Sequence, residues 1–140
     1  MIQEEKELLL KDLSGRLPYG VKCQIDTGDA DVYVDTLATI TIDGCACFLE
    51  TIDTEDVLEY GDIKPYLFPS SSMTEEQMIE YKSLCNKVTS ECGDIYGTRF
   101  VEDYYYDTVE SIDYLYKNHI DIRGIIPRGL AIDATGKNIY

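Results

Sequence analysis

The hydrophobic period of the chain changes once near its start, and this change indicates a helix followed by a sheet. Over residues 2–13 apolar side chains recur at helical spacing, with Leu9 and Leu13 on one stripe. Ser14 and Gly15 are expected to end this helix. From residue 21 onward the period is two, which is typical of a strand with one buried face.

A turn signal extends this β structure. Asp43-Gly44 lies between two apolar runs, and it is the strongest hairpin signal in the chain because Asp-Gly suits a type I′ turn. We therefore expect antiparallel strands over residues 21–52, in a small sheet that could close into a barrel.

The second half of the chain predicts two more helices and a short final strand. Two prolines and three serines follow residue 64, so a boundary between two lobes is expected near residues 65–71. Thr74 and Gln77 form a capping box for a helix that should run to about Val88. A third helix should begin near residue 108, and a strand broken by Pro and Gly should close the chain. The expected fold is one α+β domain spanning residues 1–140.

The charge of the chain excludes several classes of function. There are 27 acidic and 12 basic side chains in 140 residues, a formal net charge of -15. Such a surface repels nucleic acid and anionic membranes and favours a partner with a basic surface. Hydrophobic residues make up 44% of the chain, including 12 tyrosines, so a folded core is expected rather than an acidic disordered tail.

The five cysteines and the first residues both favour the cytoplasm. The cysteine number is odd and the spacing shows no disulfide framework, which predicts free thiols in a reducing compartment. The first seven residues are acidic and do not have the basic and then apolar layout of a signal peptide.

Three phrases of the chain are distinctive when taken together: Arg-Leu-Pro-Tyr-Gly-Val-Lys at 16–22, Ile-Lys-Pro-Tyr-Leu at 63–67 and Arg-Gly-Ile-Ile-Pro-Arg-Gly-Leu-Ala-Ile-Asp at 123–133. With these phrases the chain resembles a family of small uncharacterised proteins carried by gut Bacteroidetes and by their phages and mobile elements. The resemblance spans nearly the whole chain and is weakest in the middle sheet. It implies a bacterial cytosol or phage setting, and it carries over no catalytic residue.

Asp26-Thr27-Gly28 is the sharpest chemical motif in the chain. Retroviral-type aspartic proteases use Asp-Thr-Gly to bring two carboxylates together across a dimer. Here the later apolar pair at 125–126 is followed by Pro127 rather than Gly, so a local turn is the preferred interpretation.

No cofactor or metal site is predicted. Cys45 and Cys47 should lie on one strand face as a core-facing pair, without the additional ligands that a structural zinc site needs. The acidic residues of the chain do not form an EF-hand calcium loop, because the Gly that such a loop requires at its sixth position and the Glu at its twelfth are absent.

Tyr104-Tyr105-Tyr106 is the candidate binding site. Three adjacent rings cannot all face one core, and exposed tyrosines are favoured anchors at protein interfaces.

The sequence therefore predicts a non-enzymatic acidic binding protein, monomeric and cytoplasmic, with no direct contact to nucleic acid or membrane. Its partner would be a host protein, which it could engage as a mimic of nucleic acid. The alternatives are a small structural adaptor and, less favoured, a protease that uses Asp26.

Overall fold

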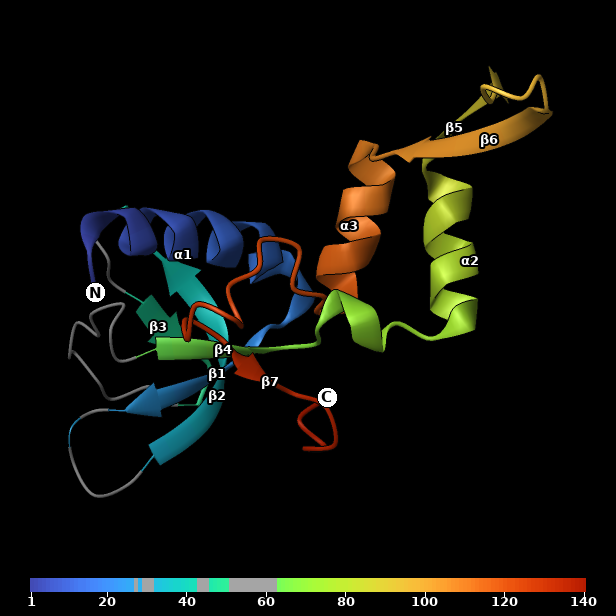
Figure 1. The fold of residues 1–140 in the computed structure, drawn as a ribbon. Coiled ribbons are helices and arrows are strands. Elements are labelled where there is room, and N and C mark those ends of the chain that lie inside the picture. Colours follow the sequence, from blue (N-terminus) through green and yellow to red (C-terminus); the bar gives the residue numbers. More distant parts are fainter. Residues whose placement is uncertain (27, 29–31, 43–45, 51–62) are drawn as a thin grey trace. The chain divides into compact units, whose positions relative to one another are not determined.

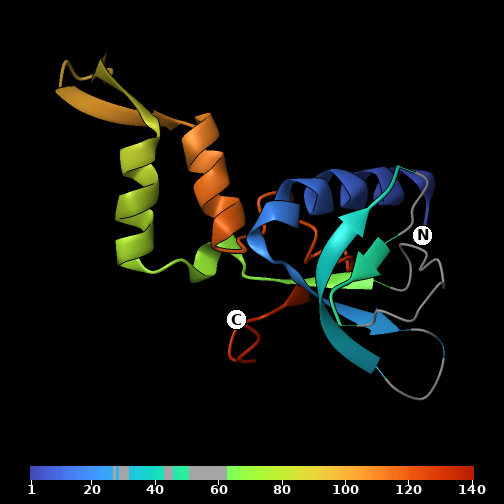
Figure 2. The ribbon, with the colours of Figure 1, turned by 180° about the vertical axis from the view of Figure 1, so that it is seen from behind.

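The computed structural model describes residues 1–26, 28, 32–42, 46–50 and 63–140, which form two compact units (Figures 1 and 2). The first unit comprises Met1–Ser72 and Tyr116–Tyr140, and the second comprises Met73–Leu115. The Asp43-Gly44 turn and Cys45 lie outside the described residues. No helix in the described part of the chain is long and apolar enough to cross a membrane.

The first unit is a helix on a five-stranded sheet, with strand order β3-β2-β1-β4-β7. The pairs among β1, β2, β3 and β4 are antiparallel, whereas β7 pairs in parallel with β4. The α+β prediction is confirmed, and the sheet is open rather than closed into a barrel. The elements are α1 (Gln3–Arg16), η1 (Leu17–Tyr19), β1 (Lys22–Asp26), β2 (Val32–Ile40), β3 (Ala46–Phe48), β4 (Ile63–Leu67), η3 (Ser70–Ser72) and the short final strand β7 (Ile132–Asp133).

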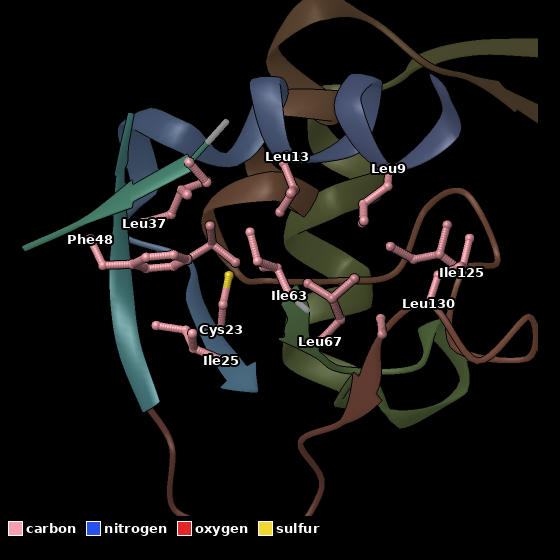
Figure 3. Packing of buried hydrophobic residues seen from close by; sticks show 13 residues of the cluster. Leu9, Leu13, Cys23, Ile25, Leu37, Phe48, Ile63, Leu67, Ile125 and Leu130 are labelled. Atoms are coloured by element: carbon pink, nitrogen blue, oxygen red, sulfur yellow. The ribbon is translucent and has the colours of Figure 1, made fainter. Parts of the chain in front are cut away.

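The core of this unit lies between α1 and the sheet. Leu9 and Leu13 point from α1 into the same cluster of buried side chains that contains Cys23 of β1 and Ile63 of β4 (Figure 3). All four side chains are completely buried, and burial raises the pKa of the Cys23 thiol so that it stays protonated. The alternating apolar residues of β1 therefore lie on the face of the sheet against which α1 packs.

The first helix does not end at Ser14-Gly15, as the sequence suggested, but continues to Arg16. Gly15 has another role, because a Cβ atom there would lie 2.5 Å from the Tyr116 ring. The glycine therefore leaves space for an aromatic ring, and it does not end the helix.

The first residues of the segment expected to hold the lobe boundary, 65–71, are not irregular, because Ile63–Leu67 forms strand β4 beside β1. Pro65 pairs with Cys23 across the two strands. On its other edge, the described residues pair with β4 at Tyr66 and Leu67 and not at Pro65, so a residue without an N–H is tolerated there.

The second unit is a helical pair that carries a β-hairpin. Its elements are α2 (Glu75–Leu84), β5 (Asn86–Gly93), β6 (Arg99–Tyr106) and α3 (Val109–Lys117), whose last residues belong to the first unit. The predicted capping box is present, since Thr74 Oγ1 accepts a hydrogen bond from the Gln77 backbone N–H, and Gln77 Oε1 accepts one from the Thr74 N–H.

The second helix ends at Leu84, not near Val88, and Val88 lies in strand β5. The sequence prediction extended the helical stripe into a strand because apolar residues of a short strand can also match helical spacing.

Candidate protein-binding ribbon

Strands β5 and β6 form a two-stranded antiparallel ribbon in which eight residue pairs follow one another without a bulge, from Asn86↔Tyr106 to Gly93↔Arg99. Every residue of β6 is exposed, and those of β5 are exposed or half-buried. Within its unit the ribbon runs from the ends of α2 and α3 and extends past them (Figure 1). A two-stranded hairpin without further packing is only marginally stable in water. The exposed side chains of the ribbon therefore contribute little to the stability of the fold, and a role in binding is the alternative.

The two faces of the ribbon differ in chemistry. Residues paired across an antiparallel ladder share a face, and the faces alternate along each strand. The apolar face carries Asn86, Val88, Ser90, Cys92, Phe100, Glu102, Tyr104 and Tyr106. The polar face carries Lys87, Thr89, Glu91, Gly93, Arg99, Val101, Asp103 and Tyr105.

Glu102 is the one charged side chain on the apolar face, and neighbours on that face bind its carboxylate. The Tyr104 hydroxyl donates a hydrogen bond to Glu102 Oε2, and the Cys92 thiol lies 3.8 Å from the same oxygen. The hydrogen bond to Glu102 is the main reason that the pKa of Tyr104 is raised to about 12. The Tyr104 hydroxyl therefore remains neutral. The apolar face thus presents aromatic side chains and a single carboxylate, that of Glu102, which is hydrogen-bonded within the face.

The structure divides the three predicted tyrosines between the two faces. Tyr104 and Tyr106 are 41% and 57% exposed on the apolar face. Tyr105 is 39% exposed on the polar face, where the Lys82 ammonium lies 5.1 Å from the centroid of its ring. Because Lys82 belongs to α2, the polar face is turned toward that helix and the apolar face away from it.

Two further exposed apolar residues, Ile95 and Tyr96, lie at the tip of the ribbon, where their exposed fractions are 92% and 85%. Asp94 orders this tip, since its Oδ1 accepts hydrogen bonds from the N–H groups of Tyr96 and Thr98 at 2.9 Å. Neither the two strands nor the tip was predicted from the sequence. The spacing of Asp94 and Gly97 was an available signal, because Asp first and Gly fourth is typical of a type I turn.

The second unit has little apolar interior of its own. Its buried residues are Ser111 and Leu115, and no residue of α2 is buried. Hydrogen bonds join its segments instead: the Tyr81 hydroxyl donates to Asp107 Oδ1 at 2.5 Å, and the Thr108 hydroxyl donates to the Leu84 carbonyl at 2.7 Å. The ribbon's aromatic residues are therefore not needed to fill a core.

The other sequence candidates lie in the first unit. The exposed Asp26 carboxylate accepts a hydrogen bond from the Gly28 N–H at 3.0 Å, which is the geometry of a local Asx turn. Cys47 is exposed, so the expectation of a core-facing Cys45–Cys47 pair is wrong for Cys47: the alternation of β3 buries Ala46 and Phe48 instead. Among the described residues, no group of three metal-ligating side chains lies close enough together to hold an ion.

No protein-family model, curated protein or solved structure matches this chain. The structure establishes an α+β fold with an exposed amphipathic ribbon.

Proposed function

We propose that this protein is a non-enzymatic binding protein that engages a second protein through the apolar face of the β5–β6 ribbon. The observation that supports this proposal is the exposure of four large apolar side chains on one face. Val88, Tyr104 and Tyr106 are neighbours there, and Phe100 lies beyond Glu102 on the same face. Large exposed apolar patches on soluble proteins mark interaction sites, and tyrosines are frequent anchors in them.

The charge of the second unit indicates the kind of partner. The unit carries three basic residues, Lys82, Lys87 and Arg99, and ten acidic ones: Glu75, Glu76, Glu80, Glu91, Asp94, Glu102, Asp103, Asp107, Glu110 and Asp113. A second copy of the same unit would be repelled by this charge, whereas a partner with basic residues around an apolar groove would be attracted. The occupant of the ribbon is therefore a different, basic protein.

The resemblance to proteins of gut Bacteroidetes and their phages supplies the proposed setting, which is the bacterial cytoplasm and a host protein as the partner. Mimicry of nucleic acid receives no support from the apolar face, which carries one carboxylate, Glu102, instead of a regular array of acidic groups. Contacts to its aromatic side chains are the better account of binding.

The test measures which proteins of a Bacteroidetes lysate are retained by three immobilised forms of the protein. These are the parent, the double variant Tyr104→Ala/Tyr106→Ala and the control Val101→Ala, which alters the polar face. We expect a basic host protein that the parent and the control retain and the double variant loses. With that protein purified, each tyrosine truncation should cost about 2 kcal/mol of binding free energy, a roughly 30-fold rise in Kd.

Equal melting temperatures of the three forms would show that the double variant is folded. If every retained protein binds the double variant as well as the parent, the apolar face is not the binding site and the proposal fails.

A further inference from the structure

On the polar face of the ribbon, opposite the proposed partner surface, the second unit has a hollow of about 410 Å³. This volume is within the range of sites that hold small molecules. The hollow lies between the last turns of α2 and the neighbouring ends of the two strands. Its lining residues are Ile79, Lys82, Ser83, Cys85, Lys87 and Tyr105.

The charge of this hollow is opposite to that of its unit. Two of the three basic residues in the second unit, Lys82 and Lys87, line it, and no acidic side chain does. The two lysines make this position more favourable for an anion than the acidic surface of the same unit around it.

The two lysines differ in their partners. The Lys82 ammonium is positioned over the Tyr105 ring, and within the described part of the chain no carboxylate forms an ion pair with it. Lys87 Nζ lies 3.5 Å from Asp103 Oδ2, but both side chains are about half exposed, so this pair contributes little stability and can be shared with a ligand. The hollow thus offers one positioned, uncompensated cation and one weakly paired cation.

We propose that this hollow binds a small organic anion, a carboxylate or a phosphate monoester on an apolar body. The anionic group would lie against the ammonium groups of Lys82 and Lys87, and the body against the side chains of Ile79 and Tyr105. A long polyanion such as nucleic acid should not bind here, because the phosphates outside the hollow would be repelled by the surrounding carboxylates. This site does not depend on the apolar face or on the partner proposed for it.

Cys85 provides a reporter inside the hollow. Its thiolate attacks the disulfide of an aromatic reagent, which forms a mixed disulfide and releases the other half of the reagent as a thiolate. Cys92 is the internal comparison, because it lies on the other face with its sulfur 3.8 Å from the Glu102 carboxylate. An anionic reagent should therefore favour Cys85, whereas a neutral reagent should not.

The experiment uses the purified full chain with 5,5′-dithiobis(2-nitrobenzoate), a dicarboxylate, and with the neutral 4,4′-dithiodipyridine. Mass spectrometry gives the rate at each cysteine. We expect the anionic-to-neutral rate ratio to be about tenfold higher at Cys85 than at Cys92. The variant Lys82→Ala should remove most of this preference and Lys82→Arg should keep it, while Lys137→Ala removes a charge from the first unit and should change nothing.

Binding itself is measured by NMR titration with phenyl phosphate and with benzoate. Saturable shifts should centre on Lys82, Lys87 and Tyr105, and either ligand should protect Cys85 from the anionic reagent more than sodium chloride of equal ionic strength does. A response to only one of the two ligands would identify which anion the site takes. Equal rate ratios at the two cysteines, or protection by sodium chloride alone, would overturn the proposal and leave the proposed function of the apolar face untouched.

Discussion

Nε of Arg16 lies 2.7 Å from Oδ2 of Asp12 one helical turn away, and neither side chain is exposed. The Arg16 Nη2 group also donates to Asp12 Oδ1 and, at 2.7 Å, to the carbonyl of Ile120. The pair therefore joins α1 to a segment more than 100 positions later in the chain. A buried charge that loses its partner is expensive, which makes this pair a sensitive point of the first unit.

Asp12→Ala should lower the free energy of unfolding by about 3–5 kcal/mol, because it leaves the Arg16 guanidinium buried without its carboxylate. Urea denaturation followed by circular dichroism measures the change. Lys11→Ala, at the neighbouring exposed position, should stay within about 0.5 kcal/mol of the parent. A loss below about 1 kcal/mol for Asp12→Ala would mean that water reaches the guanidinium in solution.

Gly15→Ala should destabilise the protein, although helix propensity alone predicts a gain of about 1 kcal/mol for this change. The new methyl group would lie 2.5 Å from the Tyr116 ring, and the ring or the helix must move at a cost of about 1–3 kcal/mol. In a double-mutant cycle, Tyr116→Ala should remove most of this penalty. A more stable Gly15→Ala protein would show that the ring does not pack there.

Stability should fall as the pH drops from about 6.5 toward 4, and the single histidine should contribute to this fall. Burial, together with the charges of Arg16 and Lys22, lowers the pKa of His119 from 6.5 to about 4. Its ring stacks on Tyr140 with centroids 3.6 Å apart. In this window the unfolded chain binds a proton that the folded protein does not, so acid favours unfolding and the full contribution is present above pH 6.5.

The measurement is the free energy of unfolding at pH 7 and pH 5 for the parent and for His119→Asn, which tolerates the backbone φ of 59° at this position. The decrease on acidification should be smaller in the variant. Equal decreases would indicate that the folded imidazole titrates normally.

Asp26→Asn should leave folding and partner binding unchanged. An asparagine Oδ1 can accept the same hydrogen bond from the Gly28 N–H, whereas proton chemistry at a catalytic carboxylate would be lost. The comparison uses the partner assay described for the apolar face, with the melting temperature as the folding control. A folded Asp26→Asn protein that has lost all activity would favour the aspartic protease alternative.

Local patterns along the chain were enough to predict the elements that are determined by residues close together in the sequence. The capping box of Thr74 and Gln77 and the alternating burial of Cys23 and Ile25 needed no knowledge of distant residues. The α+β class followed from the change of period at residue 21. The run of three tyrosines likewise predicted that not all rings could share one face.

The tertiary structure decided what depends on residues far apart in the sequence. Gly15 could not be recognised as space for the Tyr116 ring, nor Pro65 as a residue in a sheet strand, because the determining neighbours lie about 100 and about 40 positions away. The grouping of Tyr104 with Val88 and of Tyr105 with Lys87 required the register of β5 against β6. A shift of one residue would exchange the faces, and only cross-strand pairing excludes it.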